Sequence, residues 1–356
     1  MAKSDYSTKK TSNLRTGRVL LIYTGGTIGM GKNPETGALE PLDFNQLISC
    51  LPEFSMLQTN IESYQFTQPI DSSDMSPRFW SQLVRIIAER YDKYDGFVIL
   101  HGTDTMAYTA SALSFMLENL TKPVILTGSQ LPINQMRTDG KENLITSIEI
   151  ASASHSDGTP IVPEVCIYFS GRLLRGNRAT KTNADGFNAF ESFNYPHLAE
   201  AGININYREE YILKPDYTKP MVPHTAIDSN VVVFSLFPGL QEKLIHHVLE
   251  APELRSIVMR SYGSGNAPKE QWLIKMLKEA SNRGVTIVNI SQCQAGCVEM
   301  MRYDTGYMLK STGVLSGYDS TVESAVTKLM CLQARFTDYK LVRTYMNRSL
   351  CGEITV

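Results

Sequence analysis

Two short polar segments carry hydroxyl and carboxylate groups in positions where chemistry is possible. Residues 23–29 (YTGGTIG) follow the apolar run VLLI, and residues 101–105 (HGTDT) follow the apolar run FVIL. Apolar runs of this length are typical of buried parallel strands, and open α/β sheets bind ligands at the carboxyl ends of such strands. We therefore expect Thr24, Thr103 and Asp104 to converge on one crevice.

Alternating strand-like and helix-like segments should position these turns. In the N-terminal half of the chain, apolar runs alternate with helical patterns, as in a parallel sheet covered by helices on both faces. We expect strands at 18–23, 96–100, 123–127 and 164–169, and helices at 43–50, 77–91, 105–119 and 139–152.

The periodicity stops after residue 203, where a proline-containing stretch has the character of a linker. The alternation then resumes, with strands expected at 231–234, 256–259 and 285–290, and helices at 240–249, 269–280, 321–336 and 338–348. The expected fold class is α/β, with a larger N-terminal and a smaller C-terminal domain. We divide the chain into a disordered N-terminal lead (1–17), an N-terminal α/β domain with the catalytic residues (18–203), a linker (204–229) and a C-terminal α/β domain (230–356).

The composition argues against several classes of protein. A chain of 356 residues exceeds the usual size of one core, so two domains are expected. The net charge of -2 disfavours a nucleic-acid or membrane surface, and no apolar run reaches the roughly 18 residues that span a bilayer. The six cysteines are scattered, which favours reduced thiols, no metal, no cofactor and a cytoplasmic setting, with Cys166 and Cys331 as core residues.

Each polar segment also has a purely structural interpretation. The glycine-rich turn could be only a tight strand-to-helix connection, and it lacks the spacing of a nucleotide-binding loop. Asp104 or Thr105 could cap the helix that follows, although capping does not explain the whole string HGTDT. His101 lies on the strand side of its turn, so we predict a buried structural histidine rather than a base.

Two further polar loops complete the candidate set. The loop DSSDM precedes a predicted helix, which Ser73 or Asp74 should cap, and this leaves Ser72 free to donate a hydrogen bond to an anion. In the loop GNRATKTN, Lys181 lies among small polar residues. A solvent-exposed lysine is the default interpretation there, and only the fold can overturn it.

Together these segments resemble the bacterial-type L-asparaginases, and within them the cytoplasmic type I branch. The resemblance extends from Arg18 to the GEIT ending, and its threonine motifs, YTGGTI and HGTDTMA, are highly specific. It implies a larger N-terminal Rossmann-like parallel-sheet domain and a smaller C-terminal α/β domain, in dimers that pair into tetramers. It also implies hydrolysis of L-asparagine to L-aspartate and ammonia without a cofactor.

The resemblance implies a role for each polar side chain. Thr24 would be the nucleophile that attacks the side-chain amide, helped by a Thr103–Lys181 proton relay. The backbone N–H of Thr103 would help to stabilise the oxyanion. Asp104 would bind the substrate α-ammonium group, and Ser72 would bind its α-carboxylate.

Further expectations follow from the same resemblance. Asp71 belongs to the substrate-binding loop, and Asn266 resembles a residue contributed by a neighbouring subunit, so the active site would need the dimer. Many relatives carry a tyrosine in the mobile loop after the first turn, but residues 29–41 contain none, so the residue that orients the nucleophile is unassigned. Some type I relatives are activated by asparagine at a second site. The positions that resemble this site are Thr180, Arg260 and Cys293.

Two other functions stay open from the sequence alone. An amidotransferase subunit would use the same domain to release ammonia for tRNA-linked glutamate. Such subunits carry an extra N-terminal domain, whereas about seventeen residues precede the first predicted strand here. The second alternative is a catalytically inactive amino-acid-binding protein, which would have no need to keep the two threonines, the acid and the lysine together.

Overall fold

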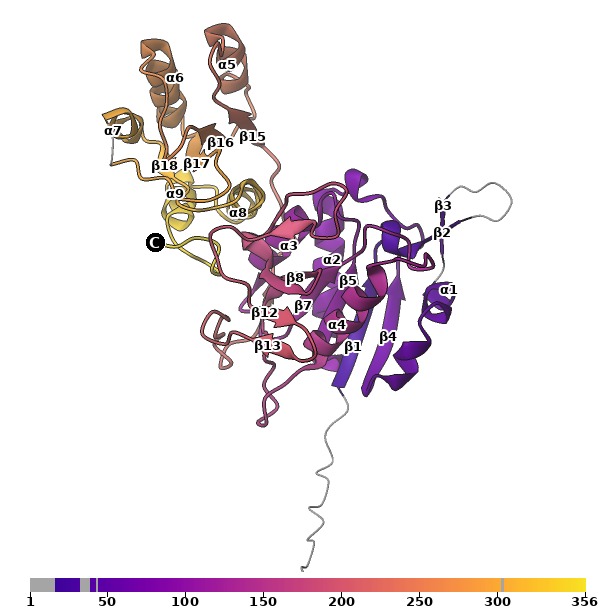
Figure 1. Ribbon diagram of the computed structural model, residues 1–356. Helices are drawn as coiled ribbons and strands as arrows, with labels where there is room; N and C mark the ends of the chain where they lie inside the picture. Colours follow the sequence, from indigo (N-terminus) through magenta and orange to yellow (C-terminus); the bar gives the residue numbers. More distant parts are fainter. Residues whose placement is uncertain (1–16, 33–38, 43, 302–303) are drawn as a thin grey trace, which may run out of the picture.

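The computed structural model describes residues 17–32, 39–42, 44–301 and 304–356. The chain forms two α/β domains, of which the N-terminal one has the larger sheet (Figure 1). This arrangement confirms the predicted fold class. The predicted N-terminal lead lies outside the described residues, except for Gly17, which begins the first strand.

An eight-stranded sheet forms the centre of the N-terminal domain. Its order is β13-β12-β9-β8-β7-β5-β1-β4, parallel from β8 to β4 and antiparallel from β8 to β13. The four strands predicted here are β1, β5, β7 and β8, which lie side by side. The strands are β1 (Gly17–Tyr23), β4 (Thr59–Gln65), β5 (Gly96–Leu100), β7 (Val124–Thr127), β8 (Val165–Phe169), β9 (Arg172–Arg175), β12 (Ala199–Ala201) and β13 (Ile205–Tyr207).

Helices cover both faces of this sheet. In β1, Leu20 and Ile22 pack with α2 and α3, whereas Val19 and Leu21 pack with α4. Because both faces are covered, the central strands are continuous apolar runs. The helices lie close to their predicted positions and are α1 (Phe44–Ser49), α2 (Pro77–Arg90), α3 (Met106–Met116) and α4 (Gly140–Ser152).

Short elements form the connections of the N-terminal domain. Three antiparallel ladders pair β2 with β3, β10 with β11, and β6 with β14. The short strands are β2 (Met30–Lys32), β3 (Leu39–Pro41), β6 (Leu117–Glu118), β10 (Thr180–Lys181), β11 (Phe190–Glu191) and β14 (Val222–Pro223). The 3-10 helices are η1 (Thr27–Gly29), η2 (Pro52–Met56), η3 (Ser72–Asp74), η4 (Tyr91–Lys93) and η5 (Gly176–Arg178).

The predicted linker is more ordered than expected. Strand β13 adds to the edge of the large sheet, and β14 pairs with β6 at the end of α3. The domain boundary predicted at residue 203 is therefore too early, because the sheet continues to Tyr207. These strands are only three and two residues long, too short to produce a recognisable periodicity.

A four-stranded parallel sheet, ordered β15-β16-β17-β18, forms the C-terminal domain. Helices α5 and α6 pack on one face, and α8 and α9 pack on the other. Helix α8 also contacts α3, and its Cys331 lies in the core of the N-terminal domain, so α8 joins the two domains. The elements are β15 (Val231–Ser235), α5 (Glu242–Leu249), β16 (Ser256–Ser261), α6 (Gln271–Asn282), β17 (Thr286–Ser291), α7 (Asp304–Ser311), β18 (Leu315–Ser316), α8 (Val322–Arg335) and α9 (Tyr339–Met346).

Two predictions about the interior can be compared with this fold. Cys166 and Cys331 are both buried, as predicted for small core residues. Among the described residues, no helix is both long enough and apolar enough to cross a membrane.

Candidate active site

Turns that follow neighbouring strands meet at the carboxyl edge of the large sheet. The backbone N–H of Thr24, after β1, donates to the Leu100 carbonyl at the end of β5 (3.1 Å). The N–H of Ile70, in the segment after β4, donates to the Thr24 carbonyl (2.7 Å). Because β1 lies between β4 and β5, the segments that follow all three strands are tied together.

Glycines let these turns approach one another. Gly26 has a φ of +91°, and a Cβ at this position would lie 2.5 Å from the backbone nitrogen of Gly102. A Cβ on Gly102 would in turn lie 2.5 Å from Ser72 Oγ. The three turns therefore pack with no space for a side chain at either glycine, and only glycine suits both positions.

Lys181 makes polar contacts with the second turn. From strand β10, its Nζ donates to Thr103 Oγ1 at 2.8 Å and to Asp104 Oδ1 at 2.7 Å. The lysine side chain is 19% exposed, whereas that of Asp104 is 62% exposed. The default interpretation of Lys181 as a solvent-exposed residue is therefore wrong. The fold brings a cation, a hydroxyl and a carboxylate within hydrogen-bond distance.

Gln130 belongs to this cluster, although it was not predicted. It follows β7, the neighbour of β5, and its Oε1 accepts from Thr103 Oγ1 at 3.3 Å. Its Nε2 donates to the carbonyls of Ala184 and Gly186 at 3.1 and 3.0 Å. The Thr103 hydroxyl thus donates to Gln130 while it accepts from Lys181. The sequence GSQ after the apolar run VILT has the same pattern as the first two turns, so the signal was present.

The two threonines of the first turn have opposite environments. Thr24 is 1% exposed, and its Oγ1 donates to the Leu100 carbonyl at 2.8 Å. Thr27, at the start of η1, is the one residue between Thr24 and Gly29 that is not buried. The hydrogen bond to Leu100 fixes the Thr24 hydroxyl in the turn and does not engage its oxygen lone pairs, so Thr24 as the nucleophile stays a prediction.

Tyr23 supports the same turn from inside the domain. Its side chain is fully buried, and its hydroxyl donates to the Gly29 carbonyl at 3.1 Å. Burial raises the pKa of this phenol to about 12, so it keeps its proton at neutral pH. The loop expected to lack the usual tyrosine includes residues 33–38, which lie outside the described part of the chain. Tyr23 supports this turn from the strand side, because its hydroxyl binds the last residue of η1.

Asp71, the first residue of the loop DSSDM, caps the short 3-10 helix η3. Asp71 Oδ1 accepts from the backbone N–H of Ser73 at 2.9 Å and from its hydroxyl at 3.0 Å, which caps η3. Helix α2 begins after Ser76 without a side-chain cap. The predicted capping of this helix by Ser73 or Asp74 is therefore wrong, because the loop forms a separate 3-10 turn.

Ser72 and Thr105 join the second and third turns. Thr105 Oγ1 donates to the Ser72 carbonyl at 2.6 Å. Thr105 is the N-cap residue of α3, but its side chain makes no capping hydrogen bond, and Asp104 pairs with Lys181 instead. The capping interpretation therefore fails for both residues. The Ser72 side chain is buried and lies against Gly102.

His101 is a structural histidine, as predicted. It is 1% exposed, and Nδ1 lies 2.7 Å from the Gly102 carbonyl, which can only accept. Nε2 therefore accepts from Thr109 Oγ1 at 2.9 Å, and Thr109 accepts from Trp80 Nε1 at 3.0 Å. Burial lowers the pKa of His101 to about 4, so the ring is neutral at pH 7. Within the described ranges, no group of three or more potential ligand side chains is arranged to bind a metal ion.

The residues predicted for a second site lie near the contact between the domains. Thr180 Oγ1 donates to Glu323 Oε1, at the start of α8, at 2.7 Å. Burial raises the pKa of Glu323, while its hydrogen bond from Thr180 and the more distant positive charge of Arg260 oppose this rise. Cys293 is exposed, and its N–H donates to Ser291 Oγ at 2.9 Å. The structure joins Thr180 to Glu323, which was not predicted, and leaves Cys293 on the surface.

Asn266 belongs to a tight turn of the C-terminal domain. Its backbone N–H donates to the Tyr262 carbonyl at 2.8 Å, and the two residues form an antiparallel bridge. The cluster around Lys181 belongs to the N-terminal domain, and Asn266 belongs to the C-terminal domain. The predicted role of Asn266 as a residue from a neighbouring subunit stays a prediction.

Comparisons with known proteins agree with this architecture. Residues 18–213 match the family model described as "Asparaginase, N-terminal", and residues 230–346 match "Glutaminase/Asparaginase C-terminal domain". The chain is similar to L-asparaginase 1 of Escherichia coli K12, with 43% identity over 343 residues that cover 95% of this chain and 98% of that protein. It is also similar to the crystal structure of L-asparaginase I from Vibrio cholerae, with 42% identity and a TM-score of 0.86 over 96% of this chain and 100% of that one.

A human relative has a different name. The human 60 kDa lysophospholipase is 40% identical over 335 residues, which cover 88% of this chain and 57% of that protein. Both family models and the similarity to type I enzymes agree with the resemblance seen in the threonine motifs. The chain belongs to the asparaginase family, and within it to the type I branch.

Proposed function

We propose that the protein hydrolyses L-asparagine to L-aspartate and ammonia. The observation that carries this proposal is the contact of Lys181 Nζ with both Thr103 Oγ1 (2.8 Å) and Asp104 Oδ1 (2.7 Å). A free amino acid needs opposite charges for recognition, and leaving either charged end unpaired in a closed site costs several kcal/mol. The exposed Asp104 carboxylate suits the α-ammonium group. The Ser72 hydroxyl suits the α-carboxylate, and Asp71 holds the Ser72 turn by accepting from Ser73.

The chemistry needs a nucleophile, a base and donors for the oxyanion. A threonine hydroxyl is a weak nucleophile, so a neighbouring base must accept its proton. In our proposal Lys181 acts in its neutral form. The nucleophile's proton passes to the Thr103 oxygen while the Thr103 proton passes to Lys181 Nζ, and the lysine then protonates the nitrogen that leaves as ammonia. Water releases aspartate from the acylated threonine and restores its hydroxyl. The backbone N–H of Thr103 stabilises the oxyanion that forms when the amide carbon is attacked. At rest the Thr103 hydroxyl accepts from Lys181 and donates to Gln130, so it turns toward the neutral lysine when the relay operates.

Within this proposal, Thr24 is the nucleophile. Its Oγ1 donates to the Leu100 carbonyl at 2.8 Å, which orients the hydroxyl in the turn that Tyr23 supports. We expect Thr24→Ala to lower kcat by about 10²-fold or more. The variant also loses a buried hydrogen bond, so its melting temperature is measured beside the rate. A loss below about tenfold in folded Thr24→Ala would remove Thr24 from the mechanism.

The primary experiment is the initial rate of ammonia release against L-asparagine concentration, from micromolar to tens of millimolar. Release by the purified chain alone would support the hydrolase and would argue against an amidotransferase subunit that depends on a partner. Absence of ammonia at every concentration, together with thermal stabilisation by asparagine, would instead support the inactive amino-acid-binding protein. We also propose a cytoplasmic setting, which the six free cysteines support.

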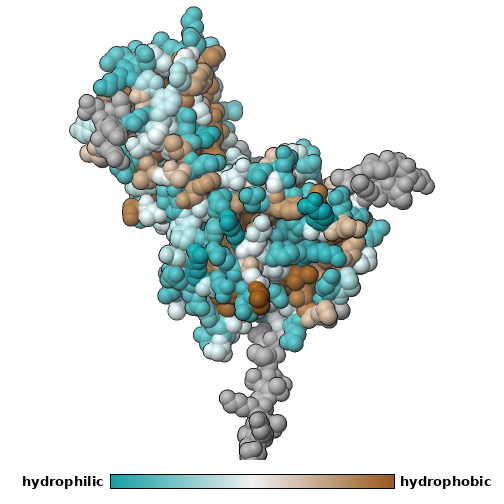
Figure 2. Space-filling view, in the orientation of Figure 1, coloured by the Kyte–Doolittle hydropathy of each residue, from teal (hydrophilic) through white to brown (hydrophobic). Residues whose placement is uncertain are grey.

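A homodimer, or a homotetramer as a dimer of dimers, forms part of the proposal. Strand β15 is at the edge of the C-terminal sheet, and exposed apolar side chains surround it: Val233 is 40% exposed, Phe237 51% and Leu244 61%. Figure 2 shows hydrophobic residues gathered on this side of the C-terminal domain. A second copy would cover them and could bring Asn266 to the neighbouring active site. Analytical ultracentrifugation tests this, and a monomer with full activity would contradict it.

We further propose that asparagine activates the enzyme at a second site around Thr180 and Arg260. The hydrogen bond from Thr180 to the buried Glu323, on whose carboxylate the charge of Arg260 also acts, supports this proposal. An arginine can bind the α-carboxylate of an amino acid through two parallel hydrogen bonds. In this proposal Cys293 is an exposed residue to which no contact with asparagine is assigned.

A further inference from the structure

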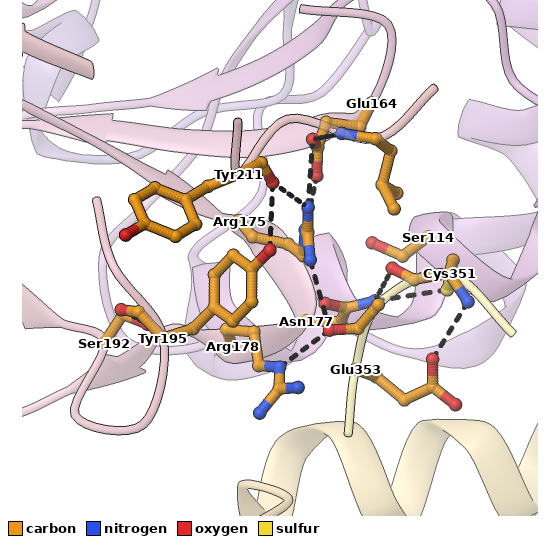
Figure 3. A network of polar contacts seen from close by, with 12 residues as sticks. Ser114, Glu164, Arg175, Asn177, Arg178, Ser192, Tyr195, Tyr211, Cys351 and Glu353 are labelled. Carbon is orange, nitrogen blue, oxygen red and sulfur yellow. Dashed lines mark hydrogen bonds and ion pairs between the residues drawn. The ribbon is translucent and has the colours of Figure 1, made fainter. Parts of the chain in front are cut away.

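A buried polar network joins the carboxyl-terminal tail to η5 (Figure 3). Asn177 is fully buried, and its Nδ2 lies 3.0 Å from the Cys351 carbonyl oxygen and 3.1 Å from Cys351 Sγ. The next residue, Arg178, donates from Nε to the Gly352 carbonyl at 2.7 Å and from a terminal nitrogen to Thr355 Oγ1 at 3.1 Å. Both side chains of η5 therefore bind the last residues of the chain.

The tail, residues 350–355, is itself held firmly by the C-terminal domain. Glu353 is 0% exposed, and its carboxylate accepts from the backbone N–H groups of Leu350 and Cys351 at 2.9 Å. The same carboxylate pairs with Lys328 of α8 at 2.6 Å. A buried charge is tolerated only when it is paired and hydrogen-bonded, so this arrangement leaves the tail little freedom.

Arg178 has a further anchor in the C-terminal domain. A terminal nitrogen lies 2.8 Å from Asp319 Oδ2, and both side chains are nearly excluded from solvent. Asp319 Oδ1 also accepts the backbone N–H of Thr355 at 2.8 Å. One arginine thus connects η5, the tail and the turn before α8.

The segment held in this way leads directly to Lys181. Helix η5 ends at Arg178, and β10 begins at Thr180, whose hydroxyl binds Glu323 of α8. The intervening Ala179 is fully buried. Only two residues, Ala179 and Thr180, separate Arg178 from the lysine, so we expect a shift of η5 to move the lysine backbone as well. A displacement of about 1 Å at a reacting group can lower a rate by about 10²-fold.

We propose that the carboxyl-terminal tail is a positioning element for Lys181. By binding Asn177 and Arg178, it fixes β10 so that Lys181 Nζ reaches Thr103. This inference rests on the proposed function, because it takes Lys181 as the base. A purely structural brace would change the stability of the fold but not the turnover of each folded molecule. A positioning element must lower kcat while KM changes little.

The experiment replaces the branched guanidinium group of Arg178 with the single ammonium group of lysine, which keeps the positive charge. Arg178→Lys retains a cation for Asp319 but cannot also reach Gly352 and Thr355. We expect kcat for asparagine to fall by about tenfold or more, with KM within threefold of the wild-type value, because the substrate-binding side chains are unchanged. Wild-type kcat in folded Arg178→Lys would overturn the inference.

Arg255→Lys is the matched control. Arg255 also joins a carboxylate, Asp228 at 2.6 Å, to backbone carbonyls, those of Gln333 and Phe336 at 3.1 and 3.2 Å. These partners lie outside the segment that leads to Lys181. Arg255 is 34% exposed and Arg178 2%, so the loss of melting temperature in Arg255→Lys should be no larger than that in Arg178→Lys, and its kcat should stay within twofold of the wild type. Equal losses of kcat in the two variants would show that destabilisation alone is responsible and would overturn the inference.

Thr355 provides a second test if Arg178→Lys does not fold. Thr355→Val removes the oxygen that accepts from Arg178, whereas Thr355→Ser keeps it, and the residue is exposed enough for both variants to fold. We expect a two- to threefold lower kcat for the valine variant and wild-type kcat for the serine variant. Identical kcat values in the two would overturn the inference.

Two reference samples separate failure of this inference from failure of the proposed function. If wild type releases no ammonia, or if Lys181→Met retains wild-type turnover, the proposed function fails and the tail inference fails with it. If both references behave as expected and Arg178→Lys keeps full turnover, only the role of the tail is disproved.

Discussion

The cluster around Lys181 and the contact between the domains are both built from polar side chains, but the chain assembles them in different ways. The cluster gathers turns that follow β4, β1, β5 and β7, which are neighbours in one sheet, and Lys181 reaches it from the separate ladder of β10 and β11. The contact between the domains combines η5 and β10 with α8 and the tail, which are distant in sequence and belong to different sheets or to none. The first arrangement follows from the topology of a parallel sheet, whereas the second follows from the docking of two domains.

This difference predicts different effects of mutation. In the cluster, the Asp104 carboxylate is 62% exposed and can be reached by a ligand, so we expect that removing a polar atom there affects chemistry more than folding. At the contact between the domains, the polar atoms bind one another, so removing one should affect position, coupling or stability.

The largest effect is expected at Lys181. Lys181→Met removes the proposed base but keeps the length of the side chain, so kcat should fall by about 10²-fold or more with a melting temperature near that of wild type. Steady-state ammonia release measures this, and Lys269→Met, at an exposed lysine of the C-terminal domain, is the control expected to keep full activity. A loss below tenfold would remove the lysine from the mechanism.

A smaller effect, of a different kind, is expected at Asp104. Asp104→Ala leaves the substrate α-ammonium group without a partner, so KM should rise by roughly tenfold or more while kcat also falls. Asp74→Ala, at an exposed acid of the neighbouring loop, should leave KM unchanged. If KM in Asp104→Ala equals that of wild type, another group holds the ammonium.

At the contact between the domains, the expected effect is on the shape of the rate curve. Wild type should show a sigmoidal dependence on asparagine concentration if asparagine binds near Thr180 and Arg260. Thr180→Val removes the hydrogen bond to Glu323 and should bring the Hill coefficient to about 1, with the maximal rate changed by less than about threefold. A hyperbolic wild-type curve over the full concentration range would end the second-site hypothesis.

The same comparison explains what could be predicted from the sequence. The four central strands are buried on both faces, so they appear as apolar runs, and the polar turns after them could be assigned to one edge. Gln130 follows the same rule and could have been included. The hydrogen bond from the Thr24 hydroxyl to Leu100 could not be predicted in this way, because the pattern places a turn but does not determine where its hydroxyl points.

The contact between the domains was less predictable for a physical reason. Glu323 lies at the start of an amphipathic helix, and its sequence context does not show that it will be buried against Thr180. The pairing of Arg178 with Gly352 joins residues 174 positions apart through a backbone carbonyl, which every residue type supplies. Periodicity and motif spacing carry no information about such contacts. They depend on how two completed domains fit together.

The smallest effect concerns His101, which supports the cluster without taking part in it. Its pKa of about 4 lies below the value of 6.5 expected for the unfolded chain. Above pH 6.5 both states hold a neutral ring, so His101 adds no pH dependence there. Between pH 6.5 and 4 the unfolded state binds a proton that the folded state does not. The free energy of unfolding should therefore fall with decreasing pH by up to about 1.4 kcal/mol per unit.

Urea unfolding of wild type and His101→Gln at pH 7 and pH 5 measures this contribution. The variant should be less stable at pH 7, because the bonds to Thr109 and Gly102 are altered, but it should lose less stability on acidification than wild type. The difference between the two proteins isolates His101, since both share every other titrating group. An equal loss in both would show that the buried ring does not determine the acid sensitivity of the fold.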